Sequence, residues 1–436
     1  MPNTNRLSPK GISNSFRPDF FASLAALGLL LFPVQFGLQF QGFIYGIQFD
    51  FWRICVFLLF YSVLLKCLLT RKPLNISISN LDKWVYIFCG VLIASVFWSL
   101  YPSYSARQAV DITINLVFYI ALINILPVSR ARTKFWNIWL MSTPWINGLL
   151  TLFYFIVYGG LRAGSVSGEA INISNLLAVT SIMTIPILWA STNLAGPLLR
   201  RINLLGLILA IVIIFFSESR AGMGTGVFIM LGTAWFLARQ EIMSFFKVVF
   251  ITVLIGLVGV ILSTSWFATQ TYDKIIDRVR GTVFTSSITE ARSIGQDIGR
   301  AYMYDATKTV LKSYPLSGIG LRSLKPYIEE RFNIPKGWIA HGFPIEILTN
   351  VGLVGAIPFM ILMYLIFRQL SAVRLSSRSK GNSENIYNTV LAISFLGFML
   401  HSLFRPVIIE PYFYTFCAVF SAQLKEPKIS HNSLLL

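Results

Sequence analysis

The chain has 436 residues, of which 55% are hydrophobic and only 12% are charged. Soluble domains carry about 25% charged residues, and a soluble fold could not bury so many long apolar runs. We therefore predict a polytopic all-α membrane protein, because a helix of about 20 apolar residues satisfies its own backbone hydrogen bonds in lipid. In such a protein the net charge of +18 bears on membrane orientation rather than on nucleic acid, and we expect no nucleic-acid partner.

Twelve apolar segments are long enough to predict transmembrane helices. They cover residues 20–38, 51–69, 84–100, 111–127, 137–158, 175–191, 203–217, 222–238, 247–264, 348–367, 386–403 and 406–423. The first segment has no clear small-residue cleavage site, so we interpret it as an uncleaved first helix rather than a signal peptide. All four cysteines fall within or beside apolar segments without metal-ligand spacing, which indicates packing residues.

The distribution of positive charge predicts the orientation of these helices. With a cytoplasmic N-terminus, twenty of the 36 Lys and Arg residues fall in connections on the cytoplasmic side and five in the short opposite connections. Because Lys and Arg in short loops favour the cytoplasm, both termini are predicted to be cytoplasmic. The other eleven Lys and Arg residues lie in one large loop, which follows an odd number of predicted spans and is therefore expected outside. The chain thus divides into spans one to nine (1–264), a loop domain (265–341), and spans ten to twelve with a short tail (342–436).

Part of the large loop is predicted to be helical. Residues 297–313 repeat apolar side chains at helical spacing, at Met303, Ala306 and Val310. The following sequence SYPLSGIG, at 313–320, ends the helix with a proline and two glycines. The loop is therefore a small, partly helical domain rather than a tail.

Several arginines on the outer side are candidates for anion binding. Arg220, in FFSESRAGMG, lies between two spans, where an arginine needs a partner or a watery cavity. The alternative is that it pairs with Glu218 or reaches the lipid headgroups. Arg162 is a similar lone cation in an outer loop rich in glycine and serine. Arg300 and Arg322 lie in the large loop, where an isolated charge usually belongs to a solvated face.

His341 is one of only three histidines and closes the large loop just before the tenth predicted span. An imidazole with a pKa near 6.5 suits a general base, although a histidine at a boundary can also serve only as a hydrogen-bonding group. An arginine guanidinium binds phosphate oxygens through paired hydrogen bonds and stays charged at any relevant pH. Together, these groups suit glycosyl transfer from a lipid pyrophosphate, with arginines stabilising the leaving group and no nucleotide, metal or other cofactor required.

The order of three segments resembles the O-antigen ligase and polymerase superfamily. These segments are SESRAG after a span, GRAYMYDATKTVLKSYPLSGIG in the large loop, and HGFPIEILTNVGLVG entering the next span. The resemblance implies a membrane glycosyltransferase of the bacterial inner membrane. It would act at the periplasmic face on glycan linked to undecaprenyl pyrophosphate, surrounded by membrane lipids.

The resemblance also implies roles for individual residues. Arg220 and Arg300 would contact the pyrophosphate, and His341 would activate or orient the acceptor hydroxyl. Glu346 matches the acid that follows the family histidine. The asparagine that is common directly after this histidine is Gly342 here. Possible substrate-binding residues are Arg162, which matches a looser pattern, together with Arg322 and Glu346.

Within the superfamily, a single dominant outer loop favours a ligase over a polymerase, and the short tail disfavours a protein-glycosylating relative. We expect an O-antigen ligase that transfers glycan to the lipid A core oligosaccharide during lipopolysaccharide biosynthesis. The alternative is an O-antigen or exopolysaccharide polymerase using the same lipid-linked donor. A lipid or glycan transporter is the competing class, but transporters place ionisable groups near the midplane, whereas here they gather at outer helix ends.

Overall fold

A computed structural model describes most of the predicted bundle. The described residues are 18–37, 42–44, 47–49, 51–76, 79–158, 173–194, 196–217, 219–238, 298–333, 342–376, 383–404, 408 and 410–424. Nearly all of this part of the chain is helical, as its composition predicted. The exception is an antiparallel hairpin of two short strands, β1 (Gly42–Ile44) and β2 (Ile47–Phe49), that no apolar pattern had indicated.

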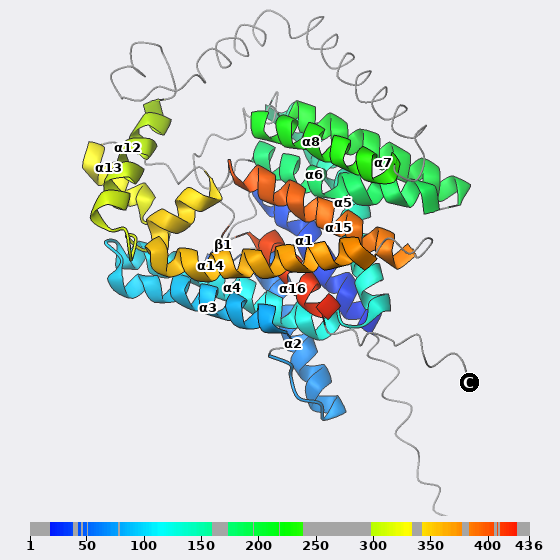
Figure 1. Cartoon of the computed structure of the whole chain (residues 1–436), viewed down its shortest axis with the longest axis horizontal. Coiled ribbons are helices and arrows are strands. Elements are labelled where there is room, and N and C mark those ends of the chain that lie inside the picture. The colour runs from blue at the N-terminus through cyan, green and yellow to red at the C-terminus, as the bar shows by residue number, and fades with distance from the viewer. Residues whose placement is uncertain are drawn as a thin grey trace, which may run out of the picture.

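The helices follow the predicted order along the chain (Figure 1). They are α1 (Pro18–Gly37), α2 (Phe51–Thr70), α3 (Asn80–Ala94) followed by the 3-10 helix η2 (Ser95–Trp98), α4 (Pro102–Ile125), α5 (Ser129–Tyr158), α6 (Ile173–Leu194), α7 (Pro197–Phe216), α8 (Arg220–Ala238), α12 (Ile298–Ser313), α13 (Leu324–Phe332), α14 (Phe343–Ser376), α15 (Ser383–Ser402) and α16 (Pro411–Leu424). Eleven of the twelve predicted spans coincide with one of these helices, and the segment 247–264 lies outside the described residues.

Several of these helices have the length and composition of membrane spans. Within the described ranges, five qualify in full: Phe51–Thr70, Asn80–Trp98, Pro102–Ile125, Pro197–Phe216 and Phe343–Leu370. Shorter apolar helices occupy Asp19–Val34, Asn175–Ser191, Ala221–Trp235 and Thr389–Ser402. The structure therefore supports an all-α, multi-pass membrane protein, while the number of twelve spans stays a prediction.

Proline sets where some helices begin. Pro102 and Pro197 occupy the first turns of α4 and α7, where a fixed φ suits the helix and a missing N–H is harmless. α4 consequently begins nine residues before the apolar segment predicted at 111. Its first turns are polar and extend beyond the apolar stretch, which is why hydropathy alone did not reveal them.

Hydrogen bonds show which helix ends lie together. At one end of the bundle, the backbone N–H of Asn75 donates to Oδ1 of Asn124 at 3.0 Å, which joins the connection between α2 and α3 to the end of α4. At the opposite end, Nε1 of Trp98 donates to the carbonyl of Ser317 at 2.8 Å. The segment between α12 and α13 therefore docks on the turn between η2 and α4.

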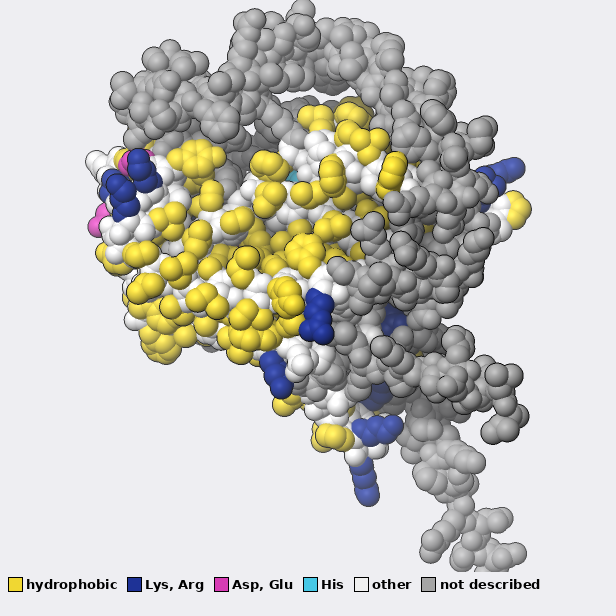
Figure 2. All heavy atoms as spheres, viewed as in Figure 1, with side chains coloured by type: hydrophobic (Ala, Val, Ile, Leu, Met, Phe, Trp, Pro, Cys, Tyr) yellow, Lys and Arg dark blue, Asp and Glu magenta, His cyan; other side chains and the backbone are white. Residues whose placement is uncertain are grey.

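The surface changes character along the bundle. Figure 2 shows a broad apolar face over the helices, with basic and acidic side chains together over α12 and α13. Near the opposite helix ends, several exposed side chains are basic: Arg71, Lys72, Lys83, Lys134 and Arg368. An apolar band between two charged ends is the surface expected of a membrane-spanning bundle.

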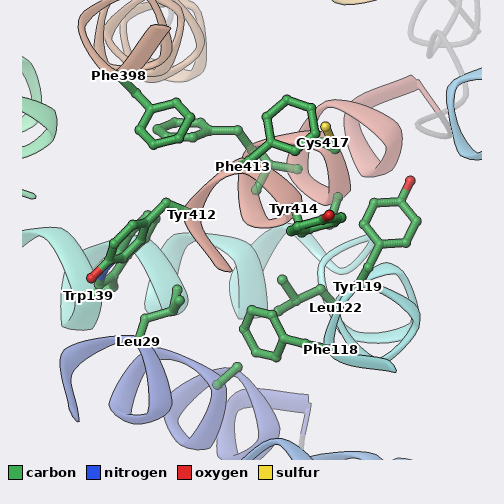
Figure 3. Close-up of a cluster of buried hydrophobic side chains, with 14 of the residues drawn as sticks. Leu29, Phe118, Tyr119, Leu122, Trp139, Phe398, Tyr412, Phe413, Tyr414 and Cys417 are labelled. Atoms are coloured by element: carbon green, nitrogen blue, oxygen red, sulfur yellow. The ribbon is translucent and has the colours of Figure 1, made fainter. Parts of the chain in front are cut away.

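α16 forms the centre of the bundle. Residues 411–422 are all buried, as expected for a helix that is apolar on every side. Trp139 of α5 stacks on Tyr412 of α16, with ring centroids 5.9 Å apart and planes 5° from parallel (Figure 3). Phe398 of α15 packs on the other side, 5.8 Å from the ring of Phe416. α16 thereby packs between α5 and α15.

Candidate functional site

The helix that follows the large loop is broken near its start. At Gly352, α14 has φ 56° and ψ −152°, which are not helical values. The break releases carbonyl and N–H groups that a continuous helix would pair internally. Backbone groups of the loop between α12 and α13 bond to them instead, through Ile319 N to Thr349 O (2.9 Å), Gly320 N to Asn350 O (2.9 Å), Leu353 N to Pro315 O (3.0 Å) and Val354 N to Leu316 O (3.1 Å).

Only glycine fits at the break. A Cβ atom added to Gly352 would lie 2.4 Å from the carbonyl oxygen of Leu316, and a positive φ is strained for other residues. The loop and the broken helix are therefore in contact through their main chains, and this contact fixes the path of residues 321–323.

Arg322 occupies this fixed path. Its φ of 55° is uncommon for a residue other than glycine, and its side chain is only 5% exposed. The backbone N–H of Arg322 donates to Oδ1 of Asn350 at 3.0 Å. Its Nε lies 3.5 Å from Oε1 of Glu346. Such strain costs about 1–3 kcal/mol and persists only where the surroundings impose it, as they often do at functional sites.

Glu346, in the first turn of α14, completes the buried ion pair. Its side chain is 3% exposed, and Oε2 accepts a hydrogen bond from the backbone N–H of Ile408 at 3.4 Å. The backbone N–H of Glu346 donates to the carbonyl of Gly342 at 2.9 Å. A second buried carboxylate, Glu410, lies within electrostatic range of Glu346. The pair thus joins α14, the loop after α12 and the segment that leads into α16.

The terminal nitrogens of Arg322 form no hydrogen bond to any residue that the structure describes. A guanidinium carries five N–H donors in a planar fork, and Glu346 faces only the one on Nε. The remaining donors can bind two oxygens of one phosphate group. This arrangement therefore provides an anchored cation suited to an anionic ligand.

A cluster of serine hydroxyls holds both neighbours of Arg322. Ser99, Ser105 and Ser323 have their Oγ atoms 2.7 to 2.9 Å apart. Ser105 also donates to the carbonyl of Leu321 at 2.9 Å. These serines were not among the predicted site residues, although Ser99 and Ser105 lie in the sequence SLYPSYS, which runs from the turn after η2 into the first turn of α4.

Of the other four predicted site residues, the structure describes the backbone of Arg220 and Arg300. Arg220 is the first residue of α8, and Arg300 is the third residue of α12. Their side chains are outside the described part of the structure, as are residues Arg162 and His341 in full. Among the six candidates, the structure brings together Arg322 and Glu346.

Gly342 explains one departure from the superfamily pattern. This residue has φ 109°, and a Cβ atom there would lie 2.5 Å from the carbonyl oxygen of Leu403. The asparagine common at this position in the superfamily would therefore require the backbone to move. The close contact with Leu403 instead places the start of α14 against the end of α15.

The site lies within a recognisable family segment. Residues 205–360 match the family model described as O-antigen ligase. This part of the chain is similar to the O-antigen ligase family. It runs from α7 to the middle of α14 and includes the Arg322–Glu346 pair, so the predicted resemblance is confirmed. The match supports a glycosyltransferase-like enzyme of the O-antigen ligase and polymerase family, with lipid-linked glycan as its class of substrate. No curated protein shows a significant match to this sequence.

Proposed function

We propose that the protein is an O-antigen ligase that transfers glycan from undecaprenyl pyrophosphate to a sugar of the lipid A core. The observation that carries this proposal is the anchored guanidinium of Arg322 within the segment similar to the O-antigen ligase family. Donors fixed in advance at a buried position stabilise charge that develops on a leaving group, and here that group is a lipid pyrophosphate. Arg220 and Arg300 are the further proposed pyrophosphate contacts, and Arg162 is a candidate contact to the donor.

In the proposed reaction, His341 acts as the general base. An oxygen of the acceptor sugar attacks the anomeric carbon, the bond from that carbon to phosphate oxygen breaks, and undecaprenyl pyrophosphate leaves. The hydroxyl proton passes to His341, and the anomeric configuration inverts. Gly342 follows His341 in the sequence, and its carbonyl accepts the N–H of Glu346. The short sequence distance between His341 and the ion pair supports the proposal.

The proposed orientation places α12, α13 and Arg322 at the periplasmic face of the bacterial inner membrane. The exposed basic residues at the opposite helix ends support it, because such residues are retained in the cytoplasm. Both termini are then cytoplasmic. The loop domain over 265–341 separates nine spans from the last three in this arrangement.

Deletion of the gene tests the proposed reaction. A ligase mutant loses O-antigen from lipopolysaccharide and accumulates long lipid-linked polymer. A polymerase mutant instead retains one repeat unit on the core. If His341→Ala cells carried fully substituted lipopolysaccharide, the base would be wrongly assigned. A purified protein that moved lipid-linked glycan between leaflets and formed no glycosidic bond would identify a transporter instead.

A further inference from the structure

A second candidate site borders the ion pair. A cavity of about 390 Å³ lies between the turn that joins η2 to α4 and one face of α13. Its lining residues are Leu100, Tyr101, Tyr327, Glu330 and Arg331. The three from α13 share a face because they are spaced three and four residues apart. The volume falls within the range of about 300–1,000 Å³ typical of small-ligand sites.

Hydrogen bonds connect both walls of this cavity, α13 and the turn before α4, to Ser323, the residue that follows Arg322. The backbone N–H of Tyr327 donates to the carbonyl of Ser323 at 3.0 Å. Ser99, whose Oγ lies 2.9 Å from Oγ of Ser323, accepts the N–H of Tyr101 at 3.0 Å. A ligand in the cavity is therefore held by the same short segment that positions the buried guanidinium.

Polar groups around the cavity are already fixed in place. The hydroxyl of Tyr101 donates to the carboxylate of Glu330. Burial, and then this hydrogen bond, raise the pKa of Tyr101, so the hydroxyl stays a donor at neutral pH. Arg331 donates to the hydroxyl of Tyr327 and to the carboxylate of Asp305, both at 3.3 Å. A ligand does not have to order these side chains when it binds, which lowers the entropic cost of binding.

The lining suits a sugar ring better than a phosphate. Two tyrosine rings and Leu100 offer apolar surface to the C–H face of a pyranose, and tyrosine combines such a surface with a polar edge. Glu330 accepts hydrogen bonds from sugar hydroxyls, and Arg331 donates them. The two charged lining residues have opposite signs, and Arg331 is already paired with Asp305. An anionic ligand thus finds no excess positive charge here.

We propose that this cavity is a subsite for one sugar ring of an oligosaccharide substrate, an inference that rests on the proposed glycan transfer. The ring lies against Tyr101 and Tyr327, and its hydroxyls bond to Glu330 and Arg331. The donor glycan and the acceptor core both contain such rings, and the experiment below distinguishes which of the two supplies the bound ring.

Binding of soluble glycans to the purified full-length protein in detergent tests the subsite directly. The probes are core oligosaccharide released from rough lipopolysaccharide by mild acid, and core-free O-antigen released by mild acid from the lipid-linked polymer. Tyr101→Phe removes the hydrogen bond that orients the Glu330 carboxylate, and Glu330→Gln replaces this charged acceptor with a neutral amide. Each change weakens binding of one probe about tenfold in calorimetry, because hydrogen bonds to charged groups are the stronger ones. Glu329→Gln, on the same helix but outside the lining, binds as the wild type does.

The affected probe identifies whether the subsite holds acceptor or donor. Failure of the wild-type protein to bind either probe overturns the proposal, and so does unchanged affinity in both lining variants. If one variant does not fold, as judged by its melting temperature, the other decides. In transfer assays, the lining variants raise KM for the same substrate about tenfold and leave kcat unchanged.

The subsite and the proposed function fail independently. If gene deletion left lipopolysaccharide and lipid-linked polymer unchanged while the binding pattern held, the ligase proposal would fail and the subsite would stand. If Arg322→Lys abolished transfer while the lining variants bound and reacted like the wild type, the subsite would fail and the ligase proposal would stand.

Discussion

Arg322 and Glu346 form an ion pair inside the protein, with Nε of Arg322 3.5 Å from Oε1 of Glu346 although 24 residues separate them in the chain. Removal of one partner of such a pair leaves an uncompensated buried charge, which costs about 3–5 kcal/mol. Glu346→Gln should therefore lower the melting temperature of the purified protein.

The double variant Arg322→Met with Glu346→Gln should recover part of this loss, because it leaves no unpaired charge. It should nevertheless transfer no glycan. If the double variant melted no higher than Glu346→Gln, an unpaired charge would not explain the loss of stability.

The variant Arg322→Lys tests whether donor binding needs the planar guanidinium or only a positive charge. Arg322→Lys keeps the positive charge but has no planar fork, so it cannot bind two phosphate oxygens in the same way. We expect transfer from the lipid-linked donor to fall at least about tenfold, corresponding to about 1.4 kcal/mol, while the protein still folds. Lys312→Ala, at the exposed end of α12, provides the control. Unaltered donor kinetics in Arg322→Lys would count against phosphate binding there.

The break in α14 should tolerate no side chain. In Gly352→Ala, the new Cβ would meet the carbonyl of Leu316, and φ would remain positive, at a cost of about 1–3 kcal/mol. Gly232→Ala, in helix α8, introduces a Cβ with no atom within 4 Å and should be neutral or stabilising. Thermal unfolding of the two variants in detergent measures the difference. Equal melting temperatures would show that the loop does not depend on the break.

The stacked pair in the core makes a separate prediction about stability. Trp139→Ala removes the ring that stacks on Tyr412 and leaves a cavity, which costs about 3–5 kcal/mol. Trp235, on α8, is 60% exposed, and Trp235→Ala should have a much smaller effect. The comparison is made by melting temperature, and similar losses at both sites would argue against α16 as the centre of the bundle.

Cysteine labelling tests the orientation of the bundle. After the four native cysteines are replaced by alanine, Lys312→Cys should react with a membrane-impermeant maleimide added to intact spheroplasts. Lys72→Cys, in an exposed position near the opposite helix ends, should react only after the membrane is opened. The reverse pattern would place the loop domain in the cytoplasm.

The sequence predicted the helices well because apolar runs of the required length are strong signals. It located them less well where polar turns extend a helix beyond the apolar stretch, as at Pro102. The predicted loop helix and its apolar stripe are confirmed, since Met303, Ala306 and Val310 are all buried. α13 was not predicted, because its nine residues contain too few apolar positions to show a period.

The site was predicted only in part, for a physical reason. Arg322 and Glu346 were both candidates, but their contact depends on a left-handed residue and on a broken helix, which no local pattern reveals. Ser99 and Ser105 bond to partners more than 200 positions away in the chain, and a serine in a turn or at a helix start gives no sign of that.

The junction between the loop and α14 also has a consequence for evolution. Its four hydrogen bonds join main-chain atoms, so they do not depend on which side chains the bonded residues carry. Pro315 and Leu316 are exposed and can be exchanged without loosening the junction, whereas Gly352 cannot. Substitutions can therefore accumulate on the outer surface of this loop while the buried arginine beneath it keeps its position.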